Sequence, residues 1–259
     1  MIDAWLNTTL FTFLLILARV GAFATALPLL GGRSSSHLAK ASLILSLTVF
    51  WFAGLSGDPT GVFQRLPSQT QWLAFALAIG REVLVGAVLG YALGLFVVPF
   101  RIAGEFIGQE MGISLGGVAD PTQNRVGPAI GQLFELLGVL ILFSLDVHHV
   151  FFAALHSTFA RWPLGELTFP VPVAPFLRAI AETQQWGLLL AAPVGVCLFI
   201  TSIFLALMAR AAPQLNILSV GFALRLAVGL VAVYMLLPDM TGSMIYVLER
   251  FSELMVGIV

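Results

Sequence analysis

The sequence predicts an all-α fold, a polytopic membrane protein built from kinked helices and helical hairpins. Its mean hydropathy is +1.01, and 59% of its 259 residues are hydrophobic against 10% charged. Soluble chains carry about 25% charged residues, so water is not the main solvent of this chain. Several apolar runs approach the length of about 20 residues that a helix needs to cross hydrocarbon. No segment alternates apolar and polar residues as the strands of a membrane barrel do.

Six long apolar runs are expected to be helical because lipid offers no partner to a free backbone amide. The long runs lie near Ala4–Leu30, Leu38–Leu55, Trp72–Pro99, Ala129–Phe143, Trp186–Met208 and Leu215–Leu237. Three shorter apolar segments lie near Phe100–Leu115, Val147–Phe159 and Ser243–Val259.

Turn residues separate these segments. Leu30–His37 is a loop of small residues whose serines are suited to cap the next helix, and Gly57–Gly61 is a second turn. Four prolines between Pro163 and Pro175 predict a non-helical break. Pro193 and Pro213 interrupt apolar runs, where we expect kinks or helix ends.

Charge and cysteine content exclude several classes of protein. The net charge of −1 gives no indication of nucleic acid binding, and the single Cys197 excludes an intramolecular disulfide and a cysteine metal cluster. The first residues lack the basic region of a cleavable signal. Arg33 and Lys40 mildly favour a cytoplasmic location for the first loop.

Glycines recur every four residues in two sets, which places each set near one helical face and lets neighbouring backbones approach closely. One interpretation is tight packing inside the chain, and the other is a surface on which helices of another subunit pack. The sets are Gly86, Gly90 and Gly94, and Gly104, Gly108, Gly112 and Gly116.

Charged residues inside apolar runs must face protein, water or the interface, because a charge at the centre of the bilayer costs about 3 kcal/mol. Arg101 and Glu105 have the spacing of a local ion pair. Most of these charges are expected to be interfacial or paired. They include Arg19, Arg81, Glu82, Glu105, Glu110, Glu135, Asp146, Arg210 and Arg225.

Catalytic, cofactor and metal motifs are weak, so we expect no enzyme and no cofactor. Gly112–Gly116 matches the Gly-x-Ser-x-Gly pattern, but no strand precedes it. An intramembrane protease would use Ser114 with a base among His148, His149 and His156, and this alternative is disfavoured. Asp146 with His149 and His156 matches no zinc spacing.

The polar stretch Gly108–Pro128 breaks the apolar pattern in the middle of the chain. Irregular backbone between apolar helices is tolerated only where protein or water surrounds it. The stretch is therefore an ordinary solvated loop, or it lines or plugs an aqueous path.

Several segments, in order along the whole chain, resemble the FliR family of flagellar export-gate proteins, with the SctT group of virulence type III secretion systems as its nearest relatives. The segments are Arg19–Gly21, Pro28–Gly31, Glu105–Leu115, Ala119–Pro121, Leu142–His149, Trp162–Gly165, Ala209–Asn216 and Gly221–Phe222.

The resemblance implies a non-enzymatic subunit of an inner-membrane export gate in the flagellar basal body. Such a subunit assembles with FliP and FliQ homologues into a channel for unfolded flagellar proteins, together with FlhA and FlhB. It also implies one integral-membrane domain over 1–259, with a FliP-like part over about 1–180 and a FliQ-like helix pair over about 181–259.

The resemblance further implies that a loop over about Met111–Arg125 plugs the closed pore. The implied plug residues are Met111, Gly112, Ile113, Leu115, Gly116, Gly117, Val118, Asp120, Pro121 and Arg125. Residues implied in helix packing or subunit contact are Gly86, Gly90, Gly94, Gly104, Gly108, Arg210, Pro213, Gln214 and Asn216. The alternatives are an SctT homologue of a virulence system and a secondary transporter of a small solute.

Overall fold

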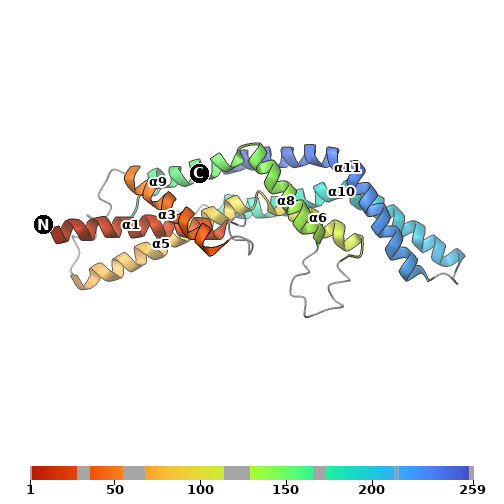
Figure 1. Cartoon of the computed structure of the whole chain (residues 1–259), viewed down its shortest axis with the longest axis horizontal. Coiled ribbons are helices and arrows are strands. Elements are labelled where there is room, and N and C mark those ends of the chain that lie inside the picture. The colour runs from red at the N-terminus through yellow and green to blue at the C-terminus, as the bar shows by residue number, and fades with distance from the viewer. Residues whose placement is uncertain are drawn as a thin grey trace. The chain divides into compact units, whose positions relative to one another are not determined.

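The computed structural model describes residues 2–27, 36–54, 68–113, 129–165, 173–212, 214 and 216–256, and in these ranges its regular secondary structure is α-helical. The helices, labelled in Figure 1, are α1 (Ile2–Ala26), α3 (His37–Gly54), α5 (Ser68–Gly94), α6 (Val98–Glu110), α8 (Ala129–Ser144), α9 (Val147–Arg161), α10 (Val173–Ala211) and α11 (Ile217–Val256). The predicted loops at Leu30–His37 and Gly57–Gly61 fall largely outside the described residues.

Five of the described helices are long and apolar enough to cross a membrane, and a sixth span results if α8 and α9 are taken together. The single-helix spans lie within α1, α3, α5, α10 and α11. The prediction of a polytopic all-α membrane protein is therefore confirmed.

The chain forms two compact units that do not follow the order of the sequence. Unit 1 comprises 1–94, 148–176 and 255–259, and unit 2 comprises 95–147 and 177–254. Unit 1 holds α1, α3, α5 and α9, whereas unit 2 holds α6, α8 and nearly all of α10 and α11.

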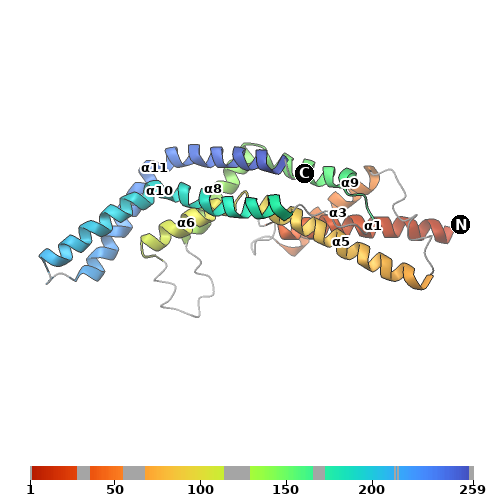
Figure 2. The same cartoon turned by 180° about the vertical axis from the view of Figure 1, so that it is seen from behind.

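Helix α1 is the centre of unit 1, because it packs along α5 and against α3. Both views of the ribbon show α1 and α5 side by side (Figures 1 and 2). Leu15 and Ile16 on α1 and Leu93 on α5 are fully buried, so this helix pair carries much of the apolar core of unit 1.

The predicted run Trp72–Pro99 is wrong at its end, because α5 stops at Gly94 and a turn leads into α6. Pro99 lies at the start of α6. Proline lacks a backbone N–H, which is tolerated in the first turn of a helix and not in its interior. The proline therefore begins a new helix and does not end the previous one.

Helices α10 and α11 of unit 2 form a hairpin of two bent helices that lie side by side in both views (Figures 1 and 2). Trp186 packs against Tyr246 in one part of the hairpin, and Gly221 lies next to Leu205 in another. Pro193 lies inside α10, so the helix does not end there as one of the two predicted outcomes would require, and Pro238 lies inside α11.

Two boundaries predicted for this hairpin are wrong. The described parts of the runs Leu215–Leu237 and Ser243–Val259 belong to one helix, α11, which continues through Pro238, since a proline does not have to end a helix. Helix α10 begins at Val173, well before Trp186, and includes a polar turn in which Arg178 pairs with Glu182. Hydropathy alone does not detect that polar turn.

Candidate functional site

The central polar stretch begins at a fixed point, the end of α6. Gly112 has a φ of 80°, in the left-handed region that favours glycine. Its N–H donates to the carbonyl of Gln109, and the N–H of Ile113 donates to that of Gly108, at 2.9 and 3.1 Å. This pair of hydrogen bonds is the Schellman motif, which stops the helix and sets the direction of the chain at residue 113.

Of the implied plug, the structure thus describes Met111, Gly112 and Ile113. The remaining implied plug residues lie outside the described residues, and their role stays a prediction. They are Leu115, Gly116, Gly117, Val118, Asp120, Pro121 and Arg125.

Glycines bring α6 close to its neighbours in unit 2. A Cβ atom added at Gly104 would lie 2.7 Å from the carbonyl oxygen of Ile130 on α8. One added at Gly187 of α10 would lie 2.7 Å from the Ile102 side chain. Real Cβ atoms essentially never approach so closely, so these helix contacts depend on the missing side chains.

Met111, at the end of α6, is fully buried. A Cβ added at Gly229 of α11 would lie 2.5 Å from its Cγ, so the methionine occupies the space that this glycine leaves. Within unit 2, the packing of Met111 against Gly229 therefore holds the start of the polar stretch next to α11.

The outer face of α6 carries the local ion pair predicted from the sequence. Arg101 Nε donates to Glu105 Oε1 at 2.8 Å, and the two side chains are 57% and 34% exposed. This hydrogen bond raises the pKa of Arg101. The prediction of the pair is confirmed, and its exposure makes it a surface feature.

The glycines of α5 face the inside of the chain. Cβ atoms added at Gly86 and Gly90 would collide with the carbonyl oxygens of Arg19 and Phe23 on α1. Gly94 and Gly108 are buried as well. The structure thus gives these residues a role in packing within the chain, and a contact with another subunit stays a prediction.

The connection between α10 and α11 contains the other implied contact residues. Arg210 and Gln214 are exposed, and Pro213 lies outside the described residues. Asn216 is exposed and caps α11, because its Oδ1 accepts from the N–H of Ser219 at 3.4 Å.

Unit 1 contains a buried ion cluster that sequence reasoning did not pair. Arg19 of α1 donates its Nε to Oε2 of Glu82, and Arg81 donates to Oε1 of the same carboxylate at 2.9 Å. All three side chains are nearly or fully buried. The sequence indicates such a cluster only through charged residues inside apolar runs. Because 63 residues separate Arg19 from Glu82, their spacing does not reveal the pair.

Both arginines also bind the end of α9. Arg19 donates to the carbonyls of Thr158 and Trp162 at 3.0 and 2.9 Å, and Arg81 donates to that of Pro163 at 2.9 Å. Thr158 lies in the last turn of α9, where the helix dipole favours positive charge, and its carbonyl also accepts from the N–H of Trp162. Trp162 and Pro163 follow the helix, so the arginines join the C-terminal end of α9 to α1 and α5.

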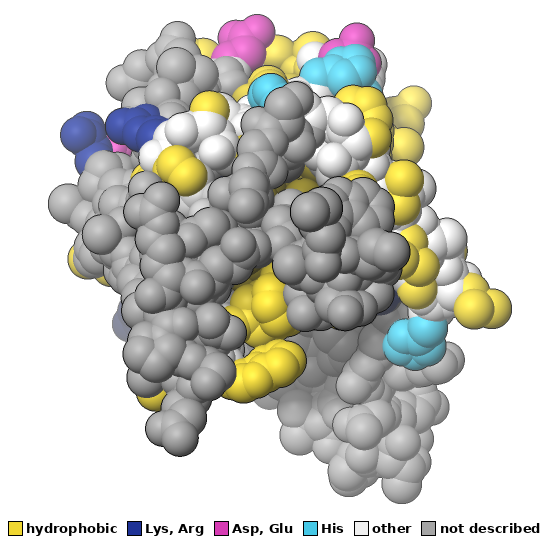
Figure 3. All heavy atoms as spheres, turned by 90° about the vertical axis from the view of Figure 1, so that its left-hand side faces the viewer, with side chains coloured by type: hydrophobic (Ala, Val, Ile, Leu, Met, Phe, Trp, Pro, Cys, Tyr) yellow, Lys and Arg dark blue, Asp and Glu magenta, His cyan; other side chains and the backbone are white. Residues whose placement is uncertain are grey.

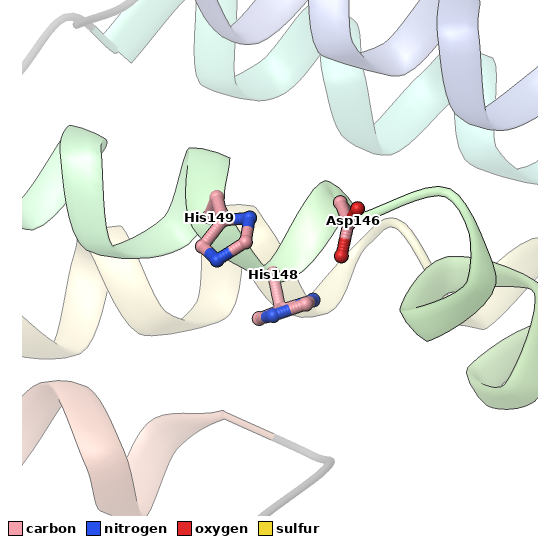
Figure 4. Close-up of side chains that lie close together, drawn as sticks. All are labelled: Asp146, His148 and His149. Carbon is pink, nitrogen blue, oxygen red and sulfur yellow. The ribbon is translucent and has the colours of Figure 1, made fainter.

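Asp146 lies in the turn between α8 and α9, and His148 and His149 lie next to it in the first turn of α9 (Figure 4). Asp146 has a φ of 57°, and the two imidazole rings lie 4.2 Å apart. The ligand atoms of Asp146, His148 and His149 lie within 4.8 Å of one another, but exposed acidic groups such as Asp146 are common without a metal, so this grouping alone carries no metal assignment.

His156, another histidine considered as a catalytic base, accepts a hydrogen bond at Nδ1 from Nε1 of Trp51 at 3.2 Å. The nucleophile imagined with it, Ser114, lies outside the described residues. The hydrogen bond gives His156 a structural role that joins α3 to α9.

A family model described as bacterial export proteins, family 1, matches residues 10–251, which is nearly the whole chain. The chain belongs to this family. The match confirms the resemblance identified from the sequence.

Curated relatives agree with this export family. The chain is 30% identical to the flagellar biosynthetic protein FliR of Escherichia coli (strain K12), over 91% of this chain and 86% of that protein. It is 29% identical to FliR of Bacillus subtilis (strain 168), over 93% and 90%. It is 22% identical to the Yop proteins translocation protein T of Yersinia pestis, over 98% of both chains.

Proposed function

We propose that the chain is a subunit of the flagellar type III export gate in the bacterial inner membrane. In this proposal it assembles with FliP-like and FliQ-like proteins into a channel for unfolded polypeptides, at the base of the flagellum and next to FlhA and FlhB. Family membership supports the proposal, and the higher identity to FliR proteins than to the Yersinia protein favours the flagellar branch.

The observation that carries the proposal is the length of the apolar helices of unit 2. The apolar span Phe176–Ala211 has 36 residues, and Ser219–Glu249 has 31. At 1.5 Å per residue these spans measure about 54 and 46 Å, whereas hydrocarbon is about 30 Å thick. Helix tilts of 0–40° do not absorb such an excess, so part of the apolar surface needs a cover other than lipid.

Within the described chain, that surface is not covered. In the apolar 18-residue windows that define the two spans, only 33% and 17% of the residues are buried. The exposed side chains are large and apolar, and they include Phe199, Ile200, Tyr234 and Met235. Figure 3 shows another face of the chain, on which hydrophobic side chains of described residues reach the surface beside acidic, basic and histidine side chains. Apolar helices of partner subunits are suited to cover such surfaces, as a hetero-oligomeric channel requires.

The same proposal assigns the plug to the stretch after α6. The Schellman motif at Gly112 and the burial of Met111 fix the base of this stretch, so residues beyond Ile113 are the part proposed to seal the pore. Met111 is then an anchor of the plug inside unit 2, and the apolar side chains of Leu115 and Val118 are proposed to block the path.

Co-expression tests the assembly. We expect the tagged chain to be recovered in a stable complex only when FliP-like and FliQ-like proteins are expressed with it, because its long apolar surfaces need cover. Native mass spectrometry of the purified material measures this. Recovery of a stable monomer in the presence of those partners would contradict the proposal.

Deletion of 116–123 tests the plug. The complex is expected to assemble with unchanged composition, and ion conductance of membranes holding it is expected to rise at rest. A replacement of the same eight residues by glycine and serine keeps the length of the loop and removes its apolar side chains. If the resting conductance of both variants equals that of the wild type, the proposed plug role of this stretch is contradicted.

A further inference from the structure

A cleft of about 460 Å³ lies between α10 and α11 in unit 2. Its wall combines aromatic and aliphatic side chains with one carboxylate, that of Asp239, and no residue of the lining is basic. The lining includes Trp186, Leu189, Asp239, Ser243, Tyr246 and Val247. The cleft therefore has negative charge on an apolar background.

The carboxylate of Asp239 is exposed, and among the residues that the structure describes no side chain pairs with it. The neighbouring hydroxyls are already committed, since Thr241 donates to the carbonyl of Pro238 and Ser243 to that of Asp239 itself. The acidic group is thus available to a donor from outside the chain.

The position of Asp239 in the apolar span makes this availability unusual. Asp239 lies inside the span Ser219–Glu249, ten residues or about 15 Å from its nearer end. An ionisable group within an apolar helical surface is costly when that surface is covered and the group is unpaired, so it marks a contact with a charged partner.

The aromatic pair indicates the chemistry of that partner. Trp186 and Tyr246 meet edge to face with ring centroids 5.7 Å apart. Aromatic faces attract ammonium and guanidinium groups, and the stems of lysine and arginine pack along apolar walls such as Leu189 and Val247. The combination of carboxylate, aromatic rings and apolar wall suits a lysine or arginine side chain, whose charged group pairs with the carboxylate while its methylene groups pack against the apolar wall.

We propose that this cleft receives a lysine or arginine side chain from an apolar helix of another subunit, and that the basic group pairs with Asp239. A lipid ammonium group is the competing occupant, and photocrosslinking distinguishes it from a protein side chain. The inference rests on the proposed function, since the helix belongs to a subunit of the same assembly.

Photocrosslinking in the complete co-expressed complex identifies the occupant. A photoreactive phenylalanine analogue at Tyr246 preserves the aromatic ring at the rim of the cleft. The expected product is a crosslink to a partner subunit, within about two helical turns of a lysine or arginine in an apolar segment. Crosslinks to lipid alone, or to no other chain, would overturn the inference.

Charge variants then test the pair itself. Asp239→Asn and Asp239→Lys are expected to lower the yield of complex about tenfold or more, while Asp239→Glu retains it, because one charge is left uncompensated in an apolar interface. Glu249→Gln makes the same kind of change on the same helix, ten residues further along and outside the cleft. Its yield is expected to exceed that of Asp239→Asn, because this carboxylate does not line the cleft.

A charge swap separates pairing from misfolding. Replacement of the crosslinked basic residue by glutamate is expected to restore assembly of Asp239→Lys. Failure of this rescue, or normal yield of the Asn and Lys variants, would overturn the inference while the wild-type complex still supports the proposed function. Absence of any complex from the wild-type chain would instead contradict the proposed function.

Discussion

Both units use glycines to bring apolar helices together, and unit 1 adds a buried ion cluster for which the described part of unit 2 shows no counterpart. In unit 1 the buried carboxylate of Glu82 holds two arginines, which in turn bind the C-terminal end of α9. In unit 2 the close contacts described run through glycines, and the ion pairs of Arg101 and Arg178 are exposed. Buried ion pairs are directional and therefore specify one arrangement of the helices that they join. Glycine contacts specify only the distance between two helices and use no charged side chains, which remain at the surface.

The largest expected effect concerns Glu82. Glu82→Gln removes the charge from beneath Arg19 and Arg81 and leaves two buried cations without compensation. Breaking a buried pair in this way costs about 3–5 kcal/mol. The free energy of unfolding, measured in mixed micelles titrated with denaturing detergent, is expected to fall by that amount.

Glu105→Gln is the control for this variant, because it makes the same chemical change in an exposed pair of unit 2. Exposed pairs contribute about 0–1 kcal/mol. Equal losses for the two variants would mean that burial of the cluster does not distinguish unit 1 from unit 2.

Alanine at the close-contact glycines is expected to have the next largest effect. Gly86→Ala places a methyl group against the backbone of Arg19, and Gly104→Ala places one against Ile130. Overpacking of this kind costs about 1–3 kcal/mol. The same unfolding measurement should show losses of similar size in both units, since both use glycine to set helix distance.

Each variant has a control in its own unit. A Cβ at Gly80 of α5 meets nothing within 4 Å, and one at Gly221 of α11 makes ordinary contacts with Leu205 at 3.5 Å or more. Alanine there is expected to be neutral or to stabilise by up to about 1 kcal/mol, because alanine favours helix over glycine. A loss at Gly80 equal to that at Gly86 would refute the packing argument.

Gly112→Ala is expected to act more locally. Alanine at a φ of 80° costs about 1–2 kcal/mol, and the strain falls on the Schellman motif at the base of the central stretch. Gly112→Asn is expected to cost less, since asparagine tolerates this region of backbone space. Hydrogen exchange of the amides of Gly112 and Ile113 measures the loosening, and equal exchange in both variants and the wild type would contradict it.

The sequence predicted those features that depend on neighbours along the chain. Apolar runs predict spans because burial in lipid is summed over consecutive residues, and Arg101 and Glu105 could be paired because four residues separate them on a helix. The missing N–H of proline predicted a kink or a helix end at Pro193, and α10 continues through this residue.

Other features depend on tertiary contacts and could not be predicted. Nothing local distinguishes Glu82 as the partner of Arg19 from the other acidic residues of the chain. Likewise, the continuation of α11 through Pro238 depends on the packing of the hairpin around it, since proline alone is compatible with a kink or an end. The polar stretch could be located, but its anchor in the contact of Met111 with Gly229 required the fold.

The smallest expected effect concerns the exposed pair of Arg178 and Glu182 in unit 2, whose side chains are 73% and 21% exposed. The arginine precedes the glutamate, which is the less favourable order relative to the helix dipole. Arg178→Gln is therefore expected to lower the free energy of unfolding by less than about 0.5 kcal/mol, and this small loss should vanish at high salt. A loss near that of Glu82→Gln, unaffected by salt, would show that charges on unit 2 also carry its fold, and the contrast between the two units would no longer hold.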